Sequence, residues 1–299
     1  MYSPIITLNI YSGRPNPRWV LSEEQTAELR ERLSAAADNL TADAPPGSLQ
    51  GLGYRGFEVR LHDDAPPLHV HGGVVGTPGV SANLADDGRE LERFLLGTID
   101  LAGGAPRGLN AAASGALSES VREHIAENLA VPPASFARTL KASYGGCPPC
   151  VAALAPPYDP GKWNNVPSVQ YNNNCYNYAN NLITNSFAQP GRGSGRMYTS
   201  LTCGSVQPAA QRDGLTASAN FSTTISNGFY CALVIWPNED FHWYRQDSGG
   251  CWSHKPGSTQ ARNTDNSGNP ITDPKTCNRG PYTDFCSYMI TYPGKVTIY

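Results

Sequence analysis

The fold of the C-terminal half is decided by the stretch Cys231-Ala-Leu-Val-Ile-Trp-Pro-Asn-Glu-Asp-Phe-His-Trp-Tyr-Arg-Gln-Asp-Ser-Gly-Gly-Cys-Trp-Ser-His-Lys255. Residues 231–236 are continuously apolar, which is the pattern of a buried strand. A turn follows at 237–240, and residues 241–246 and 251–255 then flank a glycine-containing loop, as the two strands of a β-hairpin do. The stretch therefore predicts a buried strand followed by an antiparallel hairpin.

The length of the hairpin loop decides which side chains share a face of the sheet. A three-residue loop at 248–250 pairs Tyr244 with His254 and places His242 diagonal to His254 on the same face. A loop of two or four residues puts the two histidines on opposite faces. The Gly-Gly end of the loop favours the three-residue form, so we expect the imidazoles of His242 and His254 to be neighbours.

A second informative stretch is the asparagine-rich segment 170–188, in which Cys175 follows three consecutive asparagines. Asparagine is a preferred N-cap, so the segment predicts a helix that carries Tyr178, Leu182 and Phe187, with Cys175 in its first turn. The helix dipole stabilises a thiolate at that position, and main-chain N–H groups there point outward, as an oxyanion hole requires. Two interpretations stay open for Cys175: a nucleophilic thiol or one half of a disulfide.

If Cys175 is a nucleophile, the hairpin supplies its partners. On the three-residue register, His242 accepts the proton of Cys175 and His254 orients the imidazole of His242, as in a catalytic triad. For each histidine taken alone, a hydrogen-bonded core residue is the favoured interpretation.

The composition changes near residue 145. All eight cysteines and 16 of the 22 asparagines lie beyond that point, and the net charge is −5 up to residue 150 and +2 after it. These differences predict two modules: an N-terminal module at 1–144, a Pro/Gly-rich linker at 145–162 and a Cys-rich domain at 163–299. We expect an α+β fold with disulfides.

Regular patterns also occur in the N-terminal module. Strand and helix periodicities predict strands at 6–10, 56–61 and 68–75, and helices at 22–39, 87–98 and 117–129. The run Ser12-Gly-Arg-Pro-Asn-Pro17 predicts a turn. His69 and His71 would share one strand face and could hold a metal, but no third ligand stands at a suitable spacing. We therefore predict no metal and no cofactor.

The cysteines favour an oxidising location. Eight in about 150 residues is heavy use for a reducing cytosol, and most are far apart in the sequence, which suits a disulfide framework. Cys147 and Cys150 alone have the Cys-x-x-Cys spacing of a redox dithiol, but a proline-rich segment follows them in place of a helix. Residues 1–10 lack the basic and apolar regions of a signal peptide. We still expect an extracellular or exported protein.

Charge and hydropathy exclude two classes of partner. The net charge is −3 and the basic residues are scattered, so the positive patch of a nucleic-acid-binding protein is missing. The longest apolar runs are far too short to cross a bilayer. We expect neither nucleic acid nor membrane as a partner.

The segment Asn174-Cys-Tyr-Asn-Tyr-Ala179, followed by His242 on one strand and a polar residue on the next, resembles the NlpC/P60 and CHAP-like branch of papain-like cysteine peptidases and amidases. The resemblance implies a helix packed on an antiparallel sheet, with Cys175 as nucleophile, His242 as base and His254 as orienting residue. It also implies a peptide or peptidoglycan-like substrate. The usual Asp-Cys-Ser of that group is replaced here by Asn-Cys-Tyr.

A closer likeness covers about residues 160–290. Its segments are 172–180, 187–192, 242–247, 252–257 and 279–282. They resemble a poorly characterised group that includes insoluble shell-matrix proteins of molluscs and bacterial hypothetical proteins. This likeness supplies little function, but it keeps a matrix or structural role open.

Two hypotheses follow. The first is an enzyme: a thiol-dependent hydrolase of amide bonds that uses Cys175 and His242. The alternative is a non-catalytic, disulfide-stabilised extracellular matrix or assembly protein, for which we expect a fully oxidised chain, an asparagine-rich surface and self-association.

Overall fold

The computed structural model describes residues 3–37, 39–41, 51–77, 83–99, 117–131 and 146–299. The chain forms two compact units. Unit 1 comprises Met1–Ile10, Asn16–Gln50 and Tyr54–Thr139, and unit 2 comprises Tyr11–Pro15, Gly51–Gly53 and Leu140–Tyr299. Two short segments of the N-terminal half are therefore built into unit 2. Helices and two antiparallel sheets confirm the α+β class.

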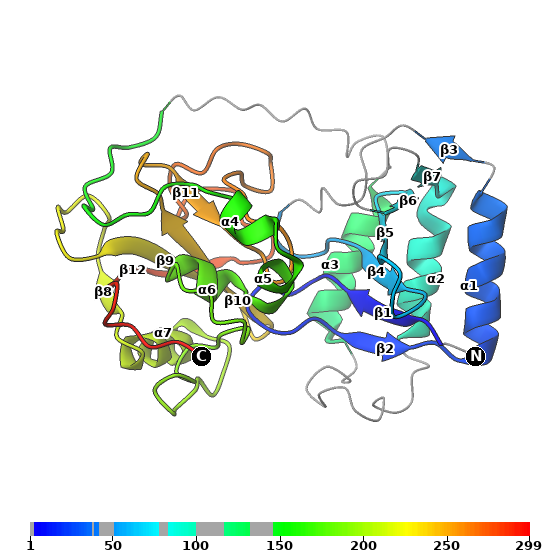
Figure 1. Cartoon of the computed structure of the whole chain (residues 1–299), viewed down its shortest axis with the longest axis horizontal. Helices are drawn as coiled ribbons and strands as arrows, with labels where there is room; N and C mark the ends of the chain where they lie inside the picture. Colours follow the sequence, from blue (N-terminus) through cyan, green and yellow to red (C-terminus); the bar gives the residue numbers. More distant parts are fainter. Residues whose placement is uncertain (1–2, 38, 42–50, 78–82, 100–116, 132–145) are drawn as a thin grey trace. The chain divides into compact units, whose positions relative to one another are not determined.

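The described part of unit 1 contains one antiparallel sheet and three α-helices (Figure 1). The strand order is β2-β1-β4-β5-β6-β7-β3, and α2 packs against α1 and β5. The strands are β1 (Ile5–Leu8), β2 (Arg18–Val20), β3 (Leu40–Thr41), β4 (Phe57–Arg60), β5 (Leu68–His71), β6 (Val74–Gly76) and β7 (Asn83–Ala85). The helices are α1 (Glu23–Ala36), the 3-10 turn η1 (Asp87–Arg89), α2 (Glu90–Thr98) and α3 (Glu119–Ala130).

Most of the sequence-based predictions for unit 1 are confirmed. Ser22 caps α1 through a capping box with Gln25, and Ser118 caps α3. One prediction is wrong: the strand expected at 68–75 is a hairpin of β5 and β6. Gly72 and Gly73 have φ values of 63° and 79°, a backbone conformation that favours glycine and reverses the chain here.

The candidate metal ligands of β5 have other surroundings. The His71 Nδ1 atom lies 3.6 Å from the Glu92 carboxylate, and its ring packs edge-on against Tyr54. Glu92 is fully enclosed and also accepts hydrogen bonds from Arg89 and Tyr54. His69 is buried on the same strand. These contacts stabilise the interior of unit 1.

Unit 2 contains the second antiparallel sheet, with strand order β11-β10-β9-β12-β8 (Figure 1). The strands are β8 (Thr216–Ser218), β9 (Phe229–Trp236), β10 (Asp240–Gln246), β11 (Trp252–His254) and β12 (Asp284–Thr291). The helices are α4 (Gly161–Asn164), α5 (Pro167–Asn172), α6 (Cys175–Ala179) and α7 (Cys203–Arg212). α6 packs against β10 and β11, and α7 packs against β9 and β12. The buried core includes Tyr176, Val206, Leu233, Ile235, Trp243 and Met289.

The predicted hairpin register is confirmed. Tyr244 pairs with His254 across β10 and β11, and the Asp247 N–H donates to the Cys251 oxygen at 2.9 Å, which closes a loop of three residues. Gly250 in this loop has φ of 89°. All residues of β9 and β10 are buried, as the apolar run 231–236 predicted for the first of them.

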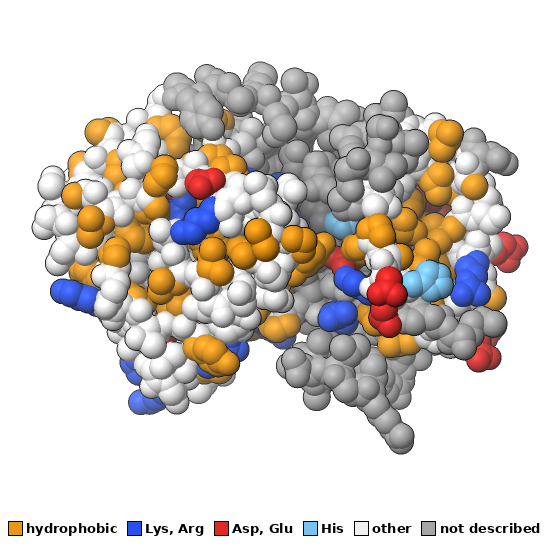
Figure 2. Space-filling model, viewed as in Figure 1, with side chains coloured by type: hydrophobic (Ala, Val, Ile, Leu, Met, Phe, Trp, Pro, Cys, Tyr) orange, Lys and Arg blue, Asp and Glu red, His pale blue; other side chains and the backbone are white. Residues whose placement is uncertain are grey.

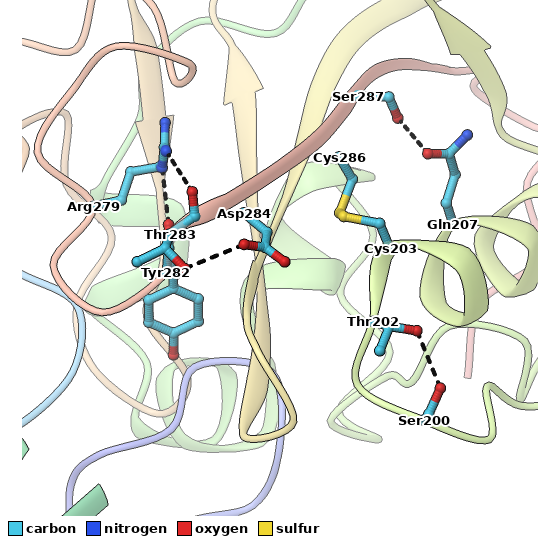
Figure 3. Close-up of a disulfide and its surroundings, with 10 residues drawn as sticks. All are labelled: Ser200, Thr202, Cys203, Gln207, Arg279, Tyr282, Thr283, Asp284, Cys286 and Ser287. Carbon is cyan, nitrogen blue, oxygen red and sulfur yellow. Dashed lines mark hydrogen bonds between the residues drawn. A yellow bond between two sulfur atoms is a disulfide. The ribbon is translucent and has the colours of Figure 1, made fainter. Parts of the chain in front are cut away.

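Two disulfides form in unit 2, Cys147–Cys251 and Cys203–Cys286. Figure 3 shows the second one, which joins the start of α7 to β12 next to a 3.0 Å hydrogen bond between Ser287 and Gln207. Four cysteines remain as thiols: Cys150, Cys175, Cys231 and Cys277. The disulfide framework is thus confirmed, whereas the expectation of a fully oxidised chain is wrong for this structure.

Replacing both Cys203 and Cys286 by alanine is expected to lower the free energy of unfolding by about 2–4 kcal/mol. The bond closes a loop with a sequence separation of 83 residues, and removing it gives the unfolded chain more conformational freedom. Urea denaturation of the variant and of the wild type measures the difference. An unchanged denaturation midpoint would contradict a structural role for this bond.

No helix among the described residues is long and apolar enough to cross a bilayer.

Candidate functional site

Cys175 is the first residue of α6, as expected, and Asn174 is the N-cap. The Asn174 side-chain oxygen accepts hydrogen bonds from the main-chain N–H groups of Tyr176 and Asn177 at 3.0 and 3.2 Å. The Asn177 side chain accepts from the Asn174 N–H in return, at 3.1 Å. Local sequence therefore fixes the position of Cys175.

The helix itself is shorter than predicted, because it ends at Ala179. Leu182 and Phe187, expected on the same helix, lie beyond its end, and Phe187 has a positive φ of 53°. Asparagine side chains replace main-chain partners here: the Asn177 oxygen accepts from the Ala188 N–H at 3.0 Å, and the Asn173 oxygen accepts from the Thr184 N–H at 3.0 Å. This competition with the helical hydrogen bonds is typical of asparagine.

The asparagines of this run are mostly interior residues. Asn173, Asn174, Asn177 and Asn180 are at most 5% exposed. The idea of an asparagine-rich surface is therefore wrong for this segment, since its amide groups bond within unit 2.

His242 and His254 are brought together, as the register predicted. Both rings are fully enclosed, and His242 Nε2 lies 2.8 Å from His254 Nδ1. His254 Nε2 lies 3.1 Å from the Thr264 oxygen, which can only accept. His254 Nε2 therefore carries a proton and donates it to the Thr264 oxygen. The two imidazoles form an ordered chain of hydrogen bonds.

The group at the other end of this chain is the hydroxyl of Ser12, which sequence reasoning did not single out. Its Oγ makes a short hydrogen bond with His242 Nδ1. The same hydroxyl is hydrogen-bonded to the side chain of Cys175. Ser12 therefore links the two groups that the sequence paired directly as nucleophile and base.

Cys175 has the properties of a protonated core thiol. It is fully enclosed, and its Sγ donates to the Phe241 oxygen at 3.9 Å. Burial, with the nearby charge of Asp240, raises the pKa of Cys175 to about 12, although the hydrogen bond with Ser12 counteracts the rise. The expected reactive thiolate at a helix start is not the state that these surroundings favour.

Asp240 is the other polar group at this site. Its carboxylate is fully enclosed and accepts from the main-chain N–H groups of Ser12, Gly13 and Arg14 and from the Tyr282 hydroxyl, the last at 2.6 Å. Burial raises the pKa of Asp240, and these four donors counteract the rise. Asp240 thus holds the Tyr11–Pro15 segment of unit 2 next to His242 and Cys175.

Alkylation of the native protein at neutral pH is expected to modify Cys150 well before Cys175. At a pKa of about 12 only about one Cys175 in 100,000 is a thiolate at pH 7, and the sulfur is enclosed, whereas Cys150 is partly exposed. Peptide mapping after timed iodoacetamide treatment measures both rates. Buried Cys231 is the matched control and should react as slowly as Cys175. Fastest labelling at Cys175 would contradict the protonated core thiol.

Comparison with known proteins gave one informative match. Insoluble matrix shell protein 1 of Ruditapes philippinarum is 52% identical over 132 residues, which are 44% of this chain and 87% of that protein. No family model matches the chain. No solved structure matches it either, so the resemblance to NlpC/P60 and CHAP-like enzymes gains no support.

Proposed function

Because the chain belongs to the family of insoluble matrix shell protein 1, we propose that it is a non-catalytic, disulfide-stabilised extracellular protein that assembles with matrix components or with further copies of itself. The observation that carries this proposal is the state of Cys175. Its thiol is enclosed, its pKa is raised to about 12, and its hydrogen bonds lead to interior groups. A side chain used in this way stabilises a core.

Two further features support the proposal. Disulfides that close long loops are typical of proteins that work outside the cell. The described face of unit 2 in Figure 2 carries few charged side chains and many hydrophobic ones. Such a surface allows close approach of copies without strong repulsion between like charges.

Sedimentation velocity on the purified, unreduced chain tests the proposal. We expect the average mass to rise with protein concentration, and we expect no hydrolysis of peptide or peptidoglycan amides by the same sample. A monodisperse monomer over the whole concentration range would contradict the assembly role.

A thiol-dependent hydrolase is the second candidate, and one observation favours it. Cys175 at the start of α6, His242 and His254 lie on one connected set of hydrogen bonds, with 2.8 Å between the imidazoles. In this proposal Cys175 is the nucleophile, His242 the base and His254 the orienting residue. Hydrolysis of a peptidoglycan or peptide amide by the wild type and its loss in Cys175→Ala would support the enzyme. Equal rates in both proteins would exclude it.

A further inference from the structure

The segment Tyr11–Pro15 is held in unit 2 chiefly through its main chain. Three consecutive N–H groups converge on Asp240: Ser12 at 2.5 Å, Gly13 at 3.1 Å and Arg14 at 2.9 Å. Successive N–H groups that point at one anion form a nest, an arrangement that binds carboxylates well. Here Asp240 supplies the carboxylate, and the Tyr11–Pro15 segment supplies the nest.

A main-chain oxygen of the segment also has hydrogen-bond partners in unit 2. The Gly13 oxygen accepts hydrogen bonds from Asn174 Nδ2 at 2.9 Å and from Gln189 Nε2 at 2.8 Å. Asn174 is fully enclosed and Gln189 is 5% exposed. The main-chain N–H groups of the segment thus meet a carboxylate, and its Gly13 oxygen meets two side-chain amide donors.

The residue types at positions 12–14 of the segment also match their surroundings. The Ser12 hydroxyl bonds to His242, and the Arg14 Nη1 atom donates to the Glu239 oxygen at 2.6 Å. A Cβ atom at Gly13 would lie 2.3 Å from a ring carbon of Phe241, so only glycine fits there. The surroundings therefore select the sequence Ser-Gly-Arg.

We propose that unit 2 contains a peptide-recognition site for Ser-Gly-Arg, formed by Asp240, Asn174, Gln189 and His242, and that during assembly this site takes the Tyr11–Pro15 segment of a second copy of the chain. The proposal rests on the assembly function above and names the contact that performs it. The partner is a peptide segment identical to the one already bound.

The sequence positions of the contacts allow the exchange. Each of these hydrogen bonds joins residues that are 161 or more positions apart, so none depends on local chain geometry. The residues before and after the segment, Met1–Ile10 and Asn16–Gln50, belong to unit 1. Every copy therefore carries the ligand in one part of its sequence and the site in another, and exchange of an identical element between copies reproduces the same contacts.

An empty site is unfavourable, which favours exchange over simple release. Without an occupant, the enclosed carboxylate of Asp240 would lose three main-chain donors, and burial of an unpaired charge is costly. The Tyr11–Pro15 segment of a second copy supplies the same three main-chain donors.

Two complementary full-length variants test the proposal. Gly13→Val makes the segment unable to fit while leaving the site intact, and Asp240→Asn alters the site while leaving the segment intact. Neither variant alone should associate, whereas their mixture should form a 1:1 complex by size exclusion with light scattering. The double variant Gly13→Val/Asp240→Asn, mixed with Gly13→Val, is the control and should form no complex.

Circular dichroism establishes that each variant is folded. Gly13→Ala and Gln189→Ala replace the first pair if either of its members is unfolded. Absence of the mixed complex between folded variants would overturn the proposal, as would variants that associate like the wild type. If the variants associate like the wild type, the exchange of this segment is contradicted but the proposed assembly function is not. A wild-type protein that stays monomeric contradicts the proposed assembly function.

Discussion

Replacing Lys255 by methionine is expected to lower the free energy of unfolding by about 3–5 kcal/mol. The lysine is fully enclosed, and its Nζ donates three hydrogen bonds of 2.6 Å to the main-chain oxygens of Gln170, Asn173 and Gly257. Methionine keeps the length of the side chain but has no donor, so three main-chain oxygens lose this partner. Urea denaturation followed by circular dichroism measures the loss.

Lys162→Met is the matched control for that variant. Lys162 is exposed and donates one hydrogen bond, to the Asn181 side chain at 2.8 Å. Its replacement should change the free energy of unfolding by less than about 0.5 kcal/mol. Equal effects of the two substitutions would show that Lys255 does not organise the connection between α5 and α6.

Replacing Arg245 by methionine is expected to cost a similar amount, about 3–5 kcal/mol at pH 7. The guanidinium is 1% exposed, lies 2.8 Å from the Asp247 carboxylate and stacks over the Tyr178 ring at 4.2 Å. Removing it leaves the buried Asp247 charge without this counter-ion. Unfolding free energies of both proteins at neutral pH give the difference.

The cost should depend on pH in a defined direction. Burial raises the pKa of Asp247, and the charge of Arg245 opposes this rise. In Arg245→Met the folded pKa rises further above the unfolded value of about 4. A raised folded pKa favours the folded state below the unfolded pKa, and this benefit is lost as the pH rises through the folded value. The variant should therefore lose less stability at pH 4 than at pH 7.

Two controls accompany this prediction. Adding Asp247→Asn to Arg245→Met removes the unpaired charge and should recover part of the loss and most of its pH dependence. Arg32→Met breaks an exposed ion pair with Glu28 and should cost at most about 0.5 kcal/mol. A cost for Arg245→Met that is independent of pH would contradict the role of the Asp247 charge.

The elements that the sequence predicted well depend on short-range chemistry. The hairpin register follows from the length of the loop after Asp247, and the place of Cys175 follows from its asparagine N-cap. The helix after Cys175 is predicted too long, because the side chains of Asn173 and Asn177 replace its main-chain hydrogen bonds. Helical periodicity does not show such competition.

The long-range contacts could not be predicted. Ser12 and His242 are 230 residues apart, and Ser12-Gly-Arg-Pro-Asn-Pro17 indicated only a turn. Eight cysteines allow 105 complete pairings, so Cys203–Cys286 could not be selected from spacing. The effect of Ser12 on the Cys175 thiol is likewise a contact between residues far apart in the sequence. The sequence therefore identified groups near the site but missed the residue that connects them.

The enclosed asparagines have a consequence for the chemical ageing of the protein. Asparagine is among the less durable side chains, and hydrolysis of its amide would create a carboxylate. At Asn173, Asn177 or Asn180 that new charge would be buried and would lose amide donors that the fold uses. Because these amides are held by hydrogen bonds away from water, damage should begin at exposed Asn227, which precedes Gly228. The fold therefore protects these asparagines from hydrolysis by enclosing them.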